Sequence, residues 1–227
     1  MKYDLLQHFS FRVKDYDKVA ECVVMNNQEL YTKVFETLKL NPEQEIKVLD
    51  IGGTTWQAMH MILKNYPKSV VTAMFFSTDM LSKARDSLRK YESRCNFNLM
   101  NQKMTIAEDT YDAVISLVSI HNVSGSQRIE LFKKIFNSLK REGQFINGDF
   151  YLGENNQLES QLLKLYTDFV KERLEGEERD FWIRHIVEDD MPMKLTEQFE
   201  VLKKIGFSNV DLKWLYAKEA IYSCTKP

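Results

Sequence analysis

The chain has 227 residues, of which 44% are hydrophobic and 28% charged, and its formal net charge is −2. This suits one large domain with a full apolar core, and the near-neutral charge argues against a nucleic-acid partner, which needs a broad basic surface. No apolar run approaches the roughly 20 residues of a membrane-spanning helix, and the amino terminus lacks the pattern of a secretory signal. Three scattered cysteines predict neither a metal site nor a disulfide framework, so we expect a cytoplasmic protein with no membrane partner.

Helices and strands are predicted to alternate through the first two thirds of the chain. Residues 1–41 are expected to be helical until Asn41-Pro42 ends the pattern. Apolar stretches then predict strands at 46–51, 69–76, 97–100, 111–119 and 144–150. Helices are predicted at 55–65, 78–91 and 126–140, the second capped by Ser77 and the third stopped by Gly143. This alternation predicts a parallel sheet with helices on both faces, and ligands at the carboxyl ends of its strands.

Residues 154–190 interrupt the alternation. Their polar-faced pattern predicts one or two helices that form a cap over the sheet. A last helix follows at 196–205, and Gly206 is expected to stop it in a left-handed conformation. Two terminal strands, 209–218 and 219–225, are predicted to form an antiparallel hairpin. The chain is therefore expected to be a single domain, residues 1–227, with a helical lid at 1–41 and the cap at 154–190.

Several local phrases carry a resemblance to a known family. They are VLDIGG (48–53), MLSKAR (80–85), YDAVISLVSIHNV (111–123), LKREGQFINGDF (139–150) and LKKIGFSNVDL (202–212). In this order, over residues 8–225, they resemble the class I S-adenosylmethionine (SAM)-dependent methyltransferases, in their small-molecule branch. The resemblance implies a Rossmann-like α/β fold with a seven-stranded, mostly parallel sheet whose last strand is antiparallel. It also implies that SAM lies across the ends of the first strands, beneath the lid and the cap.

The first motif departs from the family pattern of an acid followed by three alternate glycines. Asp50 and Gly52 match it, but Thr54 and Trp56 stand where the second and third glycines are expected. Glycines there let the backbone approach a ligand closely, whereas a branched threonine resists such a conformation. Trp56 either fills the place of the methionyl part of SAM, which we favour, or stacks on an aromatic ligand. Asp50 either contacts the methionyl amine or, as we slightly favour, caps the loop.

Two further departures concern the adenosine end of SAM. The family places an acid at the end of the second strand to bind the ribose hydroxyls, and Phe75 stands there. It places another acid after the third strand, where Asn101 and Gln102 can still accept a hydrogen bond from adenine. The residues expected around this cofactor site are Asp50, Gly52, Gly53, Thr54, Trp56, Phe75, Phe76, Asn101, Gln102 and Ser116.

Two functional hypotheses follow from these departures. The first, which we favour from the sequence, is a methyltransferase-fold protein with an eroded SAM site that serves as a partner subunit of an active paralogue or binds another ligand. The alternative is an active SAM-dependent methyltransferase that acts on a small molecule. SAM is the expected cofactor if the protein is active, otherwise none is expected, and a homo- or hetero-oligomer is compatible with both hypotheses.

Candidate substrate-side residues come from three regions. His121 follows a strong strand at the ligand edge and is the candidate general base, although a lone histidine there is often structural. Tyr16 in the lid, and Trp182 and His185 in the cap, are candidates to line a substrate pocket. A helix with one apolar face explains the two cap residues equally well. No metal-ligand pattern is recognised.

Overall fold

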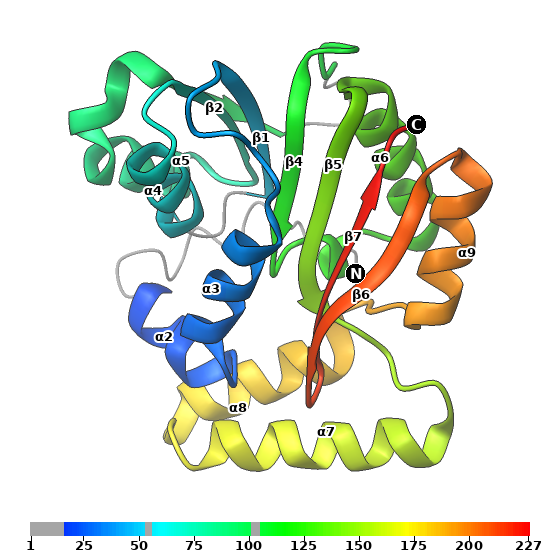
Figure 1. Cartoon of the computed structure of the whole chain (residues 1–227). Helices are drawn as coiled ribbons and strands as arrows, with labels where there is room; N and C mark the ends of the chain where they lie inside the picture. Colours follow the sequence, from blue (N-terminus) through cyan, green and yellow to red (C-terminus); the bar gives the residue numbers. More distant parts are fainter. Residues whose placement is uncertain (1–15, 53–55, 101–104) are drawn as a thin grey trace.

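A seven-stranded sheet runs through the middle of the molecule (Figure 1). The structure is a computed structural model that describes residues 16–52, 56–100 and 105–227. The strand order is β3-β2-β1-β4-β5-β7-β6, and β7 runs antiparallel to both of its neighbours while the other pairs are parallel. The strands are β1 (Ile46–Gly52), β2 (Ser69–Phe75), β3 (Cys95–Leu99), β4 (Tyr111–Leu117), β5 (Leu139–Phe150), β6 (Ser208–Tyr216) and β7 (Glu219–Thr225). This is the seven-stranded, mostly parallel sheet that the resemblance to class I methyltransferases implied, and the expected terminal hairpin is β6–β7.

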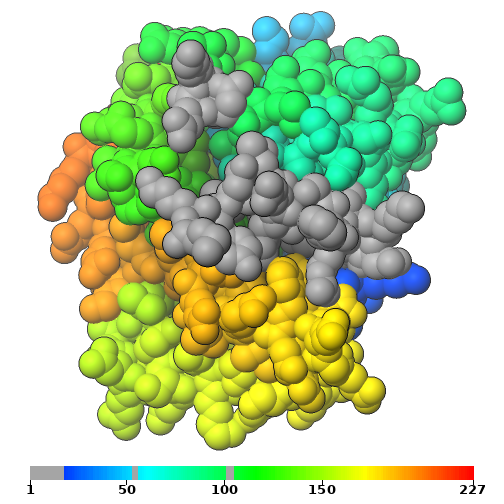
Figure 2. Space-filling model, turned by 180° about the vertical axis from the view of Figure 1, so that it is seen from behind, coloured from blue at the N-terminus to red at the C-terminus, as the bar shows by residue number. Residues whose placement is uncertain are grey.

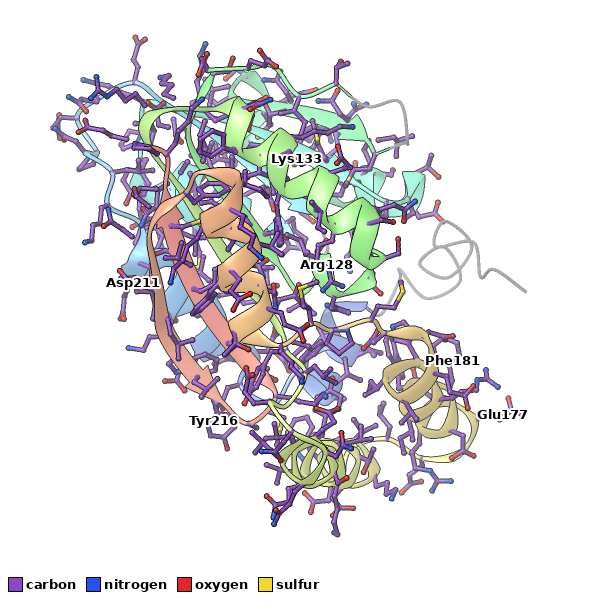
Figure 3. The ribbon with its side chains drawn as sticks, turned by 90° about the vertical axis from the view of Figure 1, so that its right-hand side faces the viewer. Arg128, Lys133, Glu177, Phe181, Asp211 and Tyr216 are labelled. Atoms are coloured by element: carbon purple, nitrogen blue, oxygen red, sulfur yellow. The ribbon has the colours of Figure 1, made fainter. Side chains whose placement is uncertain are left out.

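The central strands are buried on both faces because helices cover both sides of the sheet. Helices α3 (Asn27–Thr37), α4 (Trp56–Asn65) and α5 (Thr78–Ser87) contribute apolar residues to one core, and α6 (Gly125–Ser138) and α9 (Leu195–Ile205) contribute to the other. Only one residue of β1, Lys47, is exposed. The β6 edge is different: none of the residues of this strand, along which Figure 3 labels Asp211 and Tyr216, is buried.

The remaining helices gather at one end of the sheet. The arrowhead of β5 points toward α7 (Asn156–Lys171) and α8 (Gly176–Arg184), and α2 (Tyr16–Val23) lies near them (Figure 1). A short π-helix, η4 (His185–Asp189), continues directly from α8. Seen from behind, α7 and α8 form the lower part of the surface (Figure 2). These helices lie at the carboxyl ends of the parallel strands, where α/β proteins bind ligands.

Local signals placed some helix ends correctly. Ser77 caps α5, and its side chain accepts a hydrogen bond from the Met80 amide. Gly206 ends α9 with φ +123°, and the amide of Phe207 bonds back to the Leu202 carbonyl. The helix predicted over 78–91 is shorter, because α5 ends at Ser87 and a 3₁₀ turn, η2 (Arg89–Arg94), follows.

The prediction that Gly143 stops a helix is wrong. The helix α6 ends at Ser138, and Leu139 already has the extended conformation that begins β5. Gly143 lies within β5, where the pairing with β4 shifts register and the Gly143 carbonyl accepts from the amide of Lys226 near the chain end. Its surroundings are set by the carboxyl-terminal residues, which helix periodicity does not reveal.

Candidate active site

The switch point of the sheet lies between β1 and β4. The chain adds β2 and β3 on one side of β1, and then returns to add β4 and β5 on the other side. Gly52 ends β1 with φ +98°, and a Cβ added to it would lie 1.7 Å from Ser119 Oγ. No other residue type fits this position, since both the conformation and the space exclude a side chain. The end of β1 and the segment after β4 therefore touch at the place where the sequence predicted a ligand.

The backbone turns sharply where β4 ends. Val118 has φ +46°, which is rare for a β-branched side chain and marks stored backbone strain. A 3₁₀ turn, η3 (Ile120–Asn122), follows at once. The turn sets Ser119 against Gly52 and buries the side chain of His121, which is 4% exposed. Strain of this kind is concentrated at functional sites.

Asp149, near the end of β5, holds His121 in place. Its Oδ1 lies 2.5 Å from His121 Nδ1, and its Oδ2 accepts from the His121 backbone amide at 2.9 Å. The side-chain Nδ2 of Asn122 lies 2.9 Å from His121 Nε2. In the neutral ring, Nδ1–H donates to Asp149 and Nε2 keeps the lone pair that can accept a proton.

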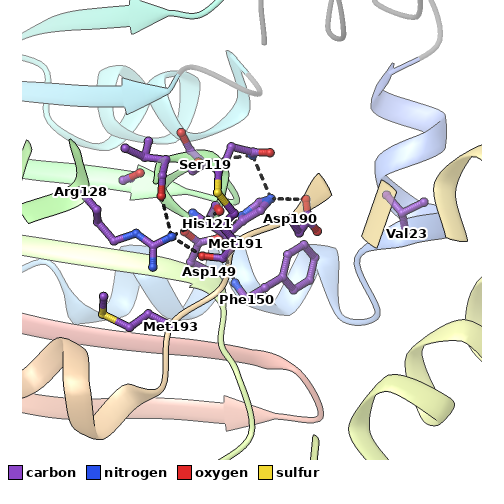
Figure 4. A network of polar contacts seen from close by, with 12 residues as sticks. Val23, Ser119, His121, Arg128, Asp149, Phe150, Asp190, Met191 and Met193 are labelled. Atoms are coloured by element: carbon purple, nitrogen blue, oxygen red, sulfur yellow. Dashed lines mark hydrogen bonds and ion pairs between the residues drawn. The ribbon is translucent and has the colours of Figure 1, made fainter. Parts of the chain in front are cut away.

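The cap reaches the same imidazole. Asp190 Oδ1 lies 3.5 Å from His121 Nε2 (Figure 4). The same oxygen lies 3.2 Å from His185 Nε2. Burial disfavours the charged form of His121, but the nearby carboxylates of Asp149 and Asp190 outweigh it, so the pKa of His121 lies above its ordinary value of 6.5. Arg128, near the start of α6, is the opposing cation (Figure 3).

A small cavity of about 20 Å³ lies beside His121. Its walls come from the ends of β4 and β5, from α2 and α7, and from the cap residues Trp182, His185 and Asp190. A cavity of this size can hold a water molecule. The structure therefore brings together three of the predicted residues, His121, Trp182 and His185, although they come from separate parts of the chain.

Asp50 lies two residues before the end of β1 and is 3% exposed. Its Oδ2 has no hydrogen-bond partner in the described part of the chain, and burial raises the pKa of this carboxyl to about 7. Ser119 Oγ is likewise buried without a partner there. A ligand that carries a positive charge and a hydrogen-bond acceptor would satisfy both groups, and the amino-acid end of SAM offers both. The β1–β4 side of the edge thus fits SAM.

The β2 side offers apolar surface instead. Phe75 is fully buried at the end of β2 and packs on Phe97 of β3 with ring centroids 6.2 Å apart. Phe76 is also buried, and its ring lies over Gly52, 3.4 Å from where a Cβ would be. The acid nearest in sequence, Asp79, is exposed on α5. The aromatic replacement of the expected ribose-binding acid is therefore an integral part of the core.

The other predicted cofactor residues have varied surroundings. Trp56, the first residue of α4, is half-buried. Its ring packs edge-to-face with the ring of His60, with the centroids 5.7 Å apart, and His60 in turn contacts Tyr91 of η2. Whether its ring blocks the methionyl position stays a prediction. Ser116 Oγ donates to the Ile51 carbonyl inside the sheet. Four candidates, Gly53, Thr54, Asn101 and Gln102, and the side chain of Tyr16 lie outside what the structure describes.

The sequence interpretation missed Asp149, Asp190 and Arg128. An acid near the end of the predicted strand 144–150, in FINGDF, was the available signal for Asp149. Nothing local marks Asp190 or Arg128. Among the described residues, no group of three or more histidine, cysteine, aspartate and glutamate side chains is arranged to hold a metal ion, and none of the described helices combines the length and apolar character needed to cross a membrane.

The chain is similar in sequence and in fold to methyltransferases and related proteins. Residues 48–143 match the family model described as "Methyltransferase domain". A carboxy-S-adenosyl-L-methionine synthase from Desulfotalea psychrophila is 24% identical over 225 residues, which cover 96% of this chain and 91% of the relative.

Two solved structures share the fold. A chain of the complex between the Haloferax volcanii Trm112 methyltransferase activator and a methyltransferase superposes with a TM-score of 0.69 at 13% identity, covering 98% of this chain and 97% of that one. Human N-acetylserotonin methyltransferase in complex with SAM gives 0.63 at 15% identity, covering 95% and 55%. The match over residues 48–143 makes this part of the chain similar to methyltransferase domains, and the sheet order is that of the class I SAM-dependent methyltransferase fold.

Proposed function

We propose that this protein is an active SAM-dependent transferase that acts on a small molecule, with His121 as the base that accepts a proton from the methyl acceptor. The observation that carries the proposal is the buried His121–Asp149 pair, which lies beside a cavity at the ligand end of the sheet. The relative from Desulfotalea psychrophila is named for a SAM derivative, which favours a ligand of the SAM type here. Of the two hypotheses from the sequence, these observations support the active enzyme better than the partner subunit.

Three residues at the β1–β4 junction would hold SAM. The Asp50 carboxylate, buried and lacking a described partner on Oδ2, suits a cationic group. Ser119 Oγ has a hydrogen bond to donate, and Gly52 keeps the backbone turn that brings Ser119 to this edge. When bound, SAM supplies an electrophilic methyl group on a sulfonium centre.

The chain's own chemistry is proton removal. Asp149 fixes the Nδ1–H tautomer, so Nε2 is the nitrogen of His121 that can take the acceptor's proton, and to do so it gives up its hydrogen bond from Asn122 Nδ2. General-base assistance of this kind contributes about 10²–10⁴-fold in rate. Because the neutral ring is the active form, the transfer rate should rise with pH through the raised pKa of His121. The acceptor is then an oxygen or nitrogen group that gives up a proton as it is methylated.

The rival function rests on Phe75. A fully buried aromatic ring at the position of the expected ribose-binding acid suits a chain that binds SAM weakly and acts as a subunit of a paralogous methyltransferase, or binds another ligand. The two functions differ in what the isolated chain should bind.

Calorimetric titration with SAM and S-adenosylhomocysteine separates the two functions. Our proposal expects binding in the micromolar range. Asp50→Asn should weaken SAM binding about ten-fold or more, because a hydrogen bond to a charged group contributes about 1.5–3 kcal/mol. His121→Gln is the control, since it removes the base but leaves the β1–β4 junction intact, and it should bind SAM as the unmodified chain does. No binding in a sample shown to be folded by circular dichroism contradicts the proposal and favours the partner subunit.

A further inference from the structure

We propose that Asp190 is a positioning residue that couples His121 to His185, so that the cap sets the proton affinity of the base in the sheet. This inference deepens the proposed function, on which the role of His121 as a base rests. Asp190 lies at the end of the cap, directly after η4, and its side chain is 5% exposed.

The carboxylate lies between two imidazoles. Asp190 Oδ1 is 3.5 Å from His121 Nε2 and 3.2 Å from His185 Nε2. All three side chains are less than one tenth exposed, so little water screens their charges. His121 consequently has one carboxylate at each ring nitrogen: Asp149 at Nδ1, from β5, and Asp190 at Nε2, from the cap.

The backbone holds Asp190 at this place independently of its side chain. The Asp190 amide donates to the His185 carbonyl at 3.1 Å, and the next amide, of Met191, donates to the carbonyl of His121 itself at 3.0 Å. Arg128, 2% exposed, donates from Nη2 to the carbonyls of His121, Val123 and Met191 (Figure 4). The end of the cap is thus fastened to the turn that carries the base, and a change of the Asp190 side chain leaves that fastening in place.

The other charged groups around His121 determine whether its pKa rises or falls when the Asp190 charge is removed. Asp149 favours the imidazolium, Arg128 disfavours it, and Tyr166 across the cavity donates its hydroxyl to the Val23 carbonyl. Removing the Asp190 charge leaves Asp149 and Arg128 unchanged, so the pKa of His121 should fall. His185 has a second acid of its own, because Asp189 Oδ2 lies 3.5 Å from its Nδ1. Asp189 is therefore a matched control that touches one imidazole and not the other.

The test is a titration of the four histidines of the full chain by NMR. In Asp190→Asn, the pKa of His121 should fall by about one unit, as expected on loss of a nearby opposite charge. In Asp189→Asn the pKa of His121 should stay unchanged. Asp190→Glu restores the charge and should restore most of the elevation at His121.

Three outcomes would overturn the inference. They are an unchanged His121 in Asp190→Asn, an equal shift in Asp189→Asn, and a Glu variant as low as the Asn variant. If Asp190→Asn does not fold, Asp190→Ser removes the same charge with a smaller side chain, and an unchanged pKa of His121 in that variant overturns the inference equally. A shift at His121 in a chain that fails to bind SAM would retain the coupling and reject only the proposed function.

Discussion

At the scale of single residues, Asp50 is a carboxyl whose charge the fold disfavours. It is 3% exposed, and burial raises its pKa from 3.8 to about 7. In the unfolded chain the group loses its proton near pH 4, whereas the folded chain keeps it until about pH 7. The unfolded state therefore binds fewer protons between these values, and the free energy of unfolding falls as pH rises through this window.

Asp50→Asn should make the ligand-free protein more stable at high pH. The amide keeps the shape of the carboxyl without its charge, so the free energy of unfolding at about pH 8 should rise by a few kcal/mol, given about 1.4 kcal/mol per unit of pKa. At about pH 4.5, where the folded carboxyl is already protonated, the change should be small. Urea denaturation at both pH values measures it. Asp86→Asn, an exposed change on α5, should be neutral at both, and an equal effect of Asp50→Asn at both would contradict the assignment.

Some of the candidate site could be predicted from single residues. Asp50, Gly52 and His121 stand in short local motifs, and the structure places all three at the switch point or just beyond it. Asp149 and Asp190 could not be assigned, because their role is contact with His121 across the fold. A carboxylate at a strand end looks the same in sequence whether it faces solvent or an imidazole.

At the scale of secondary-structure elements, helix ends with a local cause were predictable. Gly206 ends α9 at φ +123°, and a Cβ there would meet the Phe136 ring at 3.1 Å. The same glycine lets the Phe207 amide satisfy a carbonyl at the end of the helix. Gly143 also follows a helical stretch, but it lies within β5 and pairs with the carboxyl-terminal residues. A glycine after a helical pattern therefore does not by itself show where the helix ends.

Gly206→Ala should lower the free energy of unfolding by about 1–3 kcal/mol, because alanine is strained at this φ and crowds Phe136. Thermal denaturation followed by circular dichroism measures the loss. Gly125→Ala, at the start of α6, has open space around the new methyl group and should be neutral or slightly stabilising. If the two variants have the same melting temperature, the positive φ of Gly206 does not contribute to the stability of the protein.

At the scale of the whole molecule, the sheet and the cap differ in how they are held. Strands β1 and β4 lie between two apolar cores, whereas only Tyr166 and Val170 of the 16-residue α7 are buried. The free energy of local opening follows the number of buried apolar contacts. We expect amide hydrogen exchange to be slowest in β1 and β4 and faster in α7.

Val170→Ala should loosen the cap without loosening the sheet. Val170 is fully buried, and removing its two methyl groups should lower the opening free energy of α7 by about 1–3 kcal/mol. Hydrogen exchange followed by mass spectrometry would show faster exchange in α7 and α8 at unchanged rates in β1 and β4. Leu165→Ala, on the same helix but 49% exposed, is the control and should change little. Faster exchange in every strand would mean that cap and sheet open together.

The sequence by itself determined the class of this protein. Apolar periodicity and the strand–helix alternation are local, so they predicted the α/β layering, and short motifs such as the one around Asp50 and Gly52 carried the resemblance to the class I methyltransferases. Only the tertiary structure decided which groups surround His121: Asp149 from β5, Asp190 from the cap and Arg128 from α6 converge on it. Proton affinity depends on charges within a few ångströms, and the fold creates that proximity between residues far apart along the chain.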